Sequence, residues 1–100
     1  MNNWISALAN LQNQGEPCVL VTIIEELGST PRNSGSKMVI SAAQTFDTIG
    51  GGHLEYKAMQ LARDMLARRQ QHTHLERFSL GASLGQCCGG ATVLLFEPMG

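Results

Sequence analysis

A chain of 100 residues is long enough for one small domain with a modest core and too short for a deep cleft between two domains. Hydrophobic residues make up 43% and charged residues 15%, which indicates a globular protein with a sparsely charged surface. The formal charge of −1 disfavours a nucleic-acid partner, and no apolar run reaches the ~20 residues that a membrane span needs. Because the amino terminus lacks a signal-peptide pattern, we expect a cytoplasmic protein with reduced thiols.

The amino-terminal segment predicts a helix followed by a buried strand. Apolar residues recur at helical spacing over residues 3–14, Asn2 or Asn3 is available as the N-cap, and Gly15 and Pro17 follow as stop signals. Residues 18–24 are a continuous apolar and β-branched run, which is typical of a central strand covered on both faces. Cys18, at the head of this run, is interpreted as a small buried apolar residue.

A polar loop and a hairpin come next. Residues 28–36 are rich in serine and glycine and predict a loop that is long for so small a domain. Residues 37–41 and 46–49 read as two strands joined by the polar turn 42–45.

The carboxyl-terminal half predicts a second helix and two further strands. Residues 53–69 carry an apolar stripe at helical spacing, and residues 74–80 and 91–96 read as strands. The order of the elements predicts an α/β (α+β) fold class, a mixed β-sheet packed with two main helices in a single small domain. The order of the strands in the sheet does not follow from the sequence.

Gly50, Gly51, Gly52 and His53 lie where a strand runs into the second helix. Glycines let a ligand approach the backbone closely, and the positive end of a helix dipole attracts an anion such as a phosphate. His53 at the rim could donate a hydrogen bond or exchange a proton. The alternative is a tight turn with a solvated histidine, since the spacing matches neither a Walker loop nor the dinucleotide fingerprint.

Cys87 and Cys88 lie near the end of a glycine-rich stretch, residues 79–90. So many glycines leave the backbone too much conformational freedom for a role in packing, which favours a loop that contacts a ligand or partner. Thiolates bind soft metals and carry sulfur, and nearby backbone N–H groups would lower their pKa. Burial of one thiol as an ordinary apolar residue stays open, whereas a structural zinc site lacks further ligands. Arg32 and Lys37, in a third stretch, could complete an anion site, or belong to an ordinary polar loop.

Four motifs taken in order resemble the XdhC/CoxI family of xanthine dehydrogenase accessory proteins. They are Gly-Ser-Thr-Pro-Arg at 28–32, Gly-Ser-Lys-Met at 35–38, Thr-Ile-Gly-Gly-Gly-His-Leu-Glu at 48–55 and Leu-Gly-Gln-Cys-Cys-Gly-Gly at 84–90. The resemblance implies a protein that binds molybdenum cofactor (molybdopterin), supports its sulfuration by a cysteine desulfurase and delivers it to the large subunit of xanthine dehydrogenase. It also implies no turnover by the protein itself.

By the same resemblance, Gly50 to His53 and Arg32 would hold the phosphate or the pterin. Cys87 or Cys88 would face the molybdenum or the sulfur being moved, with Cys87 as the metal ligand and Gln86 beside it among the cofactor-binding residues. Residues 1–100 would form the amino-terminal domain of the family, with a carboxyl-terminal Rossmann-like domain absent from this chain. A homodimer is the expected form.

Two other functions remain open at this point. One is a thiol-dependent enzyme that acts on a phosphorylated small molecule with His53 as base, although no carboxylate at a telling spacing orients that histidine. The other is a structural dimerisation domain in which the glycines allow tight packing between subunits, which the low charge content fits.

Overall fold

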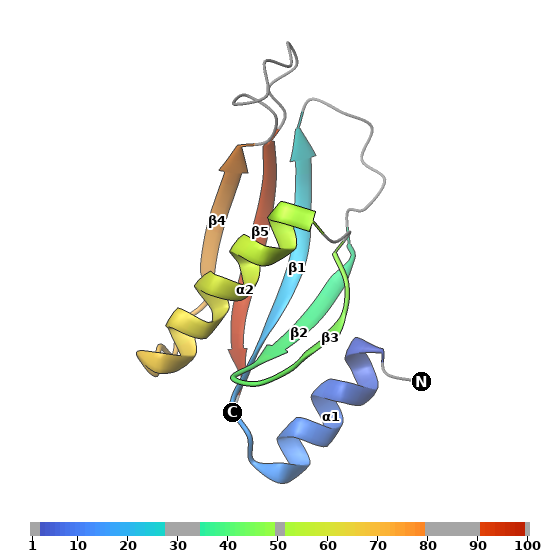
Figure 1. Cartoon of the computed structure of the whole chain (residues 1–100), viewed down its shortest axis with the longest axis vertical. Coiled ribbons are helices and arrows are strands. Elements are labelled where there is room, and N and C mark those ends of the chain that lie inside the picture. The colour runs from blue at the N-terminus through green and yellow to red at the C-terminus, as the bar shows by residue number, and fades with distance from the viewer. Residues whose placement is uncertain (1–2, 28–34, 50–51, 80–90, 100) are drawn as a thin grey trace.

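A single sheet with a helix on each face forms the core of this protein (Figure 1). The computed structural model describes residues 3–27, 35–49, 52–79 and 91–99. The elements are α1 (Trp4–Gln14), β1 (Cys18–Leu27), β2 (Lys37–Ser41), β3 (Thr45–Asp47), α2 (Gly52–Ala67), β4 (His74–Ser79) and β5 (Ala91–Met99). The strand order is β3-β2-β1-β5-β4.

The predicted fold class, two main helices packed on one sheet in a single small domain, is confirmed. One detail needs correction, because every pairing between the described strands is antiparallel and the sheet is not mixed. α2 connects β3 to β4. These two strands run in the same direction but lie at opposite edges of the sheet. A helical connection therefore carries the chain across the sheet without creating a parallel pair.

β1 lies at the centre of the sheet and is buried on both faces, as its sequence predicts. Val19, Val21 and Ile23 pack into the cluster beneath α2, whereas Cys18 and Leu20 pack into the cluster beneath α1. This separation follows from the alternation of side chains along a strand. The two helices therefore cover opposite faces, and the protein has three layers.

α1 has a hydrogen-bonding cap at each end. The side-chain Oδ1 of Asn3 accepts a hydrogen bond from the backbone N–H of Ser6 at 2.8 Å. Gly15 adopts a left-handed conformation with φ of 70°, and its N–H donates to the carbonyl groups of Gln12 and Leu11. These are the N-cap and glycine stop that the sequence predicts.

α2 rests on the sheet through the predicted apolar stripe. The stripe residues all belong to the cluster on this face or pack against it: Leu54, Ala58, Leu61, Ala62 and Met65. Ala58 and Ala62 are fully buried, and their small side chains let the helix approach the strands closely. None of the helices in the described ranges is long and apolar enough to cross a membrane.

Candidate functional site

The three stretches that the sequence singles out for chemistry are attached to one end of the sheet. β1, β3 and β4 run in the same direction, so their carboxyl ends share that end, and the amino ends of β2 and β5 lie beside them. The described chain stops at Leu27, Ile49 and Ser79 and resumes at Gly35, Gly52 and Ala91 (Figure 1). We call this end, together with the first turn of α2, the loop end.

Most of the predicted site residues lie outside the described residues: Arg32, Gly50, Gly51, Gln86, Cys87 and Cys88. Their roles therefore stay predictions. Gly52 and His53 are described, and they are the first two residues of α2. The start of α2 at Gly52 agrees with the helix that the sequence predicts over residues 53–69.

His53 is exposed on the first turn of α2. Its ring stacks on the ring of Tyr56, with 6.3 Å between centroids and 26° between planes. The Tyr56 hydroxyl accepts a hydrogen bond from Nε2 of Gln60 at 3.1 Å. The imidazole therefore lies on an aromatic neighbour in contact with solvent, where a ligand can reach it.

Glu55 is a site residue that the sequence reasoning missed. One of its carboxylate oxygens accepts hydrogen bonds from the Thr48 hydroxyl at 2.5 Å and from the Ile49 N–H at 3.3 Å. A glutamate in the first turn that reaches back beyond the helix start is a known capping pattern, and its charge is favourable near the positive end of the dipole. The same charge repels an anion, so a bound phosphate here would need a cation such as the predicted Arg32.

Lys37, whose role the sequence leaves open, lies at the amino end of β2, and its side chain makes contacts away from α2. Its Nζ donates a hydrogen bond to the Thr22 hydroxyl at 3.0 Å and lies 5.6 Å from the centre of the Trp4 ring. Lys37 pairs directly with Thr22 in the sheet, so both side chains lie on the face that α1 covers. The ammonium group therefore contacts both β1 and α1 and stabilises the packing of α1 on the sheet, on the face opposite α2.

Thr92 is a second residue that the sequence reasoning passed over. It lies next to the amino end of β5 at the loop end, and its side chain is 1% exposed. Its hydroxyl has no hydrogen-bond partner among the groups that the structure describes. The sequence did not predict this buried, unpaired hydroxyl, because Thr92 is one threonine within an apolar run.

A family model described as the XdhC and CoxI family matches residues 11–79. The chain belongs to the XdhC/CoxI family. The matched residues include the motifs at 28–32, 35–38 and 48–55 and stop before the cysteine motif at 84–90. The match to the family model therefore does not include Cys87 and Cys88.

Two longer proteins resemble this XdhC/CoxI chain. The uncharacterised protein YqeB of Escherichia coli is 33% identical over 101 residues, which cover 98% of this chain and 18% of that protein. A crystal structure described as a xanthine dehydrogenase from Bacillus halodurans superposes with a TM-score of 0.72 at 25% identity, and covers 94% of this chain and 30% of the other. This chain thus spans less than a third of either relative.

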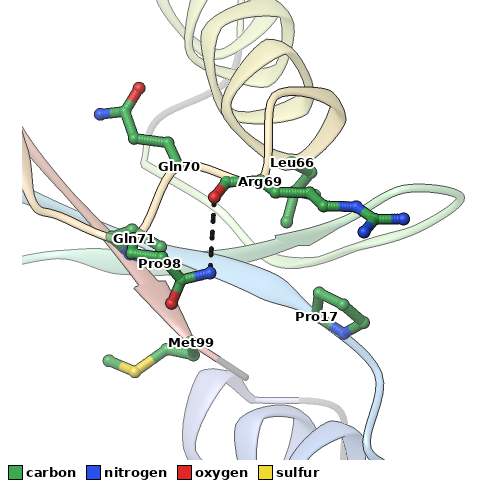
Figure 2. A pocket seen from close by; sticks show the side chains of 7 residues that line it. All are labelled: Pro17, Leu66, Arg69, Gln70, Gln71, Pro98 and Met99. Atoms are coloured by element: carbon green, nitrogen blue, oxygen red, sulfur yellow. Dashed lines mark hydrogen bonds between the residues drawn. The ribbon is translucent and has the colours of Figure 1, made fainter.

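A separate pocket of about 300 Å³ lies at the opposite end of the sheet (Figure 2). Its lining comes from the α1–β1 connection, the end of α2, the α2–β4 connection and the end of β5: Pro17, Leu66, Arg69, Gln70, Gln71, Pro98 and Met99. Gln71 Nε2 donates a hydrogen bond to the Arg69 carbonyl at 3.4 Å across it. No predicted cofactor residue lines this pocket.

Metal ligands are not assembled within the described ranges, where no three or more histidine, cysteine, aspartate or glutamate side chains are grouped closely enough to hold an ion. Cys18, the cysteine that the structure does describe, is fully buried, as its sequence position predicts. Burial raises the pKa of its thiol above the ordinary value of 9.0, and the nearby charge of Glu16 raises the pKa further. Cys18 is therefore a protonated, inert thiol at neutral pH.

The raised pKa of Cys18 predicts a loss of stability in alkali. The thiol of the unfolded chain ionises near pH 9.0, whereas the folded thiol ionises only at higher pH. The stability from the protonated thiol is therefore complete below pH 9.0 and falls as pH rises toward the folded pKa. Urea unfolding at pH 8 and pH 10 should show a larger loss for the wild type than for Cys18→Ala. Equal losses in the two proteins would contradict the assignment.

Proposed function

We propose that this XdhC/CoxI chain binds molybdenum cofactor at the loop end and prepares it for a xanthine dehydrogenase-like enzyme. One observation carries the proposal, namely that all three motif-bearing stretches leave from and return to that end of the sheet, where α2 begins. Family membership supports it, as does the likeness to a crystal structure described as a xanthine dehydrogenase.

The described groups at the loop end suit a polar cofactor. The amino terminus of a helix of 16 residues carries a positive partial charge, and the exposed His53 ring offers a donor beside it. In the proposal Arg32, Gly50, Gly51 and Gly52 hold the phosphate or pterin with His53. When bound, the cofactor would supply the metal centre for sulfuration; Cys87 would be a metal ligand, and Gln86 and Cys88 would be further cofactor-binding residues.

The proposed partners follow from the same function. They are the large subunit of xanthine dehydrogenase, which receives the cofactor, and a cysteine desulfurase, which supplies the sulfur. The chain acts as a maturation factor without turnover of its own, as an XdhC/CoxI-like domain and as a homodimer. Light scattering of the purified chain, with and without cofactor, tests the dimer.

Cofactor retention in thiol variants tests the central claim. The chain is produced together with the molybdenum cofactor pathway, and bound molybdenum and oxidised pterin are measured per chain. We expect close to one pterin per chain in the wild type and a loss of at least about tenfold in Cys87→Ala/Cys88→Ala. The reason is that mutation of residues that only hydrogen-bond to metal ligands already lowers metal affinity by roughly 10–100-fold. Cys18→Ala is the matched control, since this buried thiol lies at the opposite end of β1 from the loop end.

Two results would count against the proposal. Wild-type chain that carries no pterin would remove the cofactor-binding function. Equal pterin in the wild type and the double variant would remove the role of the thiols alone. A turnover that thiol alkylation abolishes, with cofactor binding intact, would instead favour a thiol-dependent enzyme.

A further inference from the structure

Thr92 is buried without an evident structural reason for its hydroxyl. It pairs with Glu26 of β1 and Phe78 of β4, so it lies in the middle of the sheet, one position from the ends of β1, β4 and β5. The side chain is 1% exposed and Oγ1 has no partner among the described groups. A buried hydroxyl without a partner destabilises the folded state, because it has given up its hydrogen bonds to water.

Packing alone does not explain this hydroxyl. Leu94 and Phe96, the next residues on the same face of β5, are fully buried apolar side chains of the cluster beneath α2. A valine at position 92 would have almost the same shape as threonine and would carry no polar atom. The hydroxyl therefore lowers stability where an apolar residue would suffice, which is a common property of binding sites.

Thr92 lies on the same face and at the same end of the sheet as the first turn of α2. Its side chain lies on the face of the sheet that α2 covers, and α2 begins at the same end of the sheet from which β5 departs. Figure 1 shows α2 crossing this face diagonally, with its first turn toward the loop end. The positive end of the helix and an unpaired buried hydroxyl thus lie on one face at one end of the fold.

We infer that the Thr92 hydroxyl is a binding residue that hydrogen-bonds the polar edge of a pterin ring at the loop end. This inference rests on the proposed function and names the part of the cofactor that this face receives. A neutral pterin ring suits the place better than the phosphate does, because a phosphate beside the buried, apolar Leu94 would lose its solvation. Contact requires that the groups now covering Thr92 move aside when the ligand binds.

A pair of variants separates the hydroxyl from the shape of the side chain. Thr92→Val keeps the shape and removes the hydroxyl, whereas Thr92→Ser keeps the hydroxyl and removes a methyl group. Without ligand, we expect the melting temperature to rise by roughly 4 °C in Thr92→Val and to fall in Thr92→Ser. Affinity for a phosphate-free pterin, measured by quenching of its fluorescence, should fall roughly three- to tenfold in Thr92→Val and stay unchanged in Thr92→Ser.

The outcomes distinguish this inference from the proposed function. A higher melting temperature together with weaker pterin binding in Thr92→Val supports the inference. An unchanged or lower melting temperature means that the hydroxyl is already satisfied, and unchanged pterin affinity means that the ligand does not reach it, so either result overturns it. If the wild type retains molybdopterin during purification but does not bind the phosphate-free pterin, the inference fails and the proposed function stands. If it retains neither, both fail.

Discussion

Replacing Phe96 with alanine is expected to lower the free energy of unfolding by about 3–5 kcal/mol. The ring is fully buried in β5, between the rings of His74 and Phe78 at centroid distances of 6.2 and 6.4 Å. It also pairs with Val21 of the central strand, so the cavity would open in the middle of the core beneath α2. Since a domain of this size has only about 5–15 kcal/mol of stability, urea denaturation should show a largely destabilised protein.

Leu75→Ala provides the matched control for Phe96→Ala. Leu75 belongs to the neighbouring strand β4 and pairs with Leu95, but it is 59% exposed. We expect its truncation to change stability by no more than about 0.5 kcal/mol. Comparable losses in the two variants would mean that the cluster beneath α2 is not the principal core.

Enlarging Ala58 to leucine is expected to cost about 1–3 kcal/mol and to weaken any ligand binding at the loop end. Ala58 is fully buried against the sheet in the half of α2 that begins with Gly52 and His53. A leucine has nearly the same helix propensity as alanine, so the cost would come from overpacking and displacement of the helix. Thermal unfolding and pterin retention, measured on the same preparations, test both effects.

The control for Ala58→Leu is Ala67→Leu, at the exposed last residue of the same helix. It adds the same side chain where there is space, so stability and pterin retention should both stay at wild-type values. If Ala58→Leu destabilised the protein but left pterin retention intact, the position of α2 would not matter to the site.

Much of the fold could be predicted because its signals are local. The apolar stripes of α1 and α2, the capping residues Asn3 and Gly15, and the hairpin of β2 and β3 each depend on neighbours in the sequence. The strand order depends on the pairing of β1 with β5. These strands are far apart in the sequence, and their pairing produces no periodic pattern of residues from which it could be predicted. The expectation of a mixed sheet failed for the same reason.

The lengths of two strands were also underestimated. β1 continues through Leu27 and β5 through Met99, past the glutamates and the proline at which their apolar runs stop. The end of β1 pairs with the start of β5, and the end of β5 pairs with the start of β1, so hydrogen bonds of the sheet continue where hydrophobicity no longer requires a strand. Composition could not show this, because it reports burial and not pairing.

The candidate site stays a prediction, but the helix that follows it was predictable. Gly52 and His53 lie at the start of α2 as expected, because a strand that runs through glycines into a helical stripe is a local pattern. The role of Lys37 stayed open at the level of sequence, since which face a strand residue occupies depends on register. The roles of Glu55 and Thr92 depend on contacts that only the folded chain makes.

The position of β5 governs how this protein can fold as it is synthesised. β5 is the last element of the described chain, yet it lies between β1 and β4 and is paired with both. Until β5 leaves the ribosome, β4 has no partner in the sheet, and the apolar central strand β1 exposes one edge. The nascent chain therefore holds an open, aggregation-prone edge until β5 emerges, and the sheet then closes by insertion of β5 between β1 and β4.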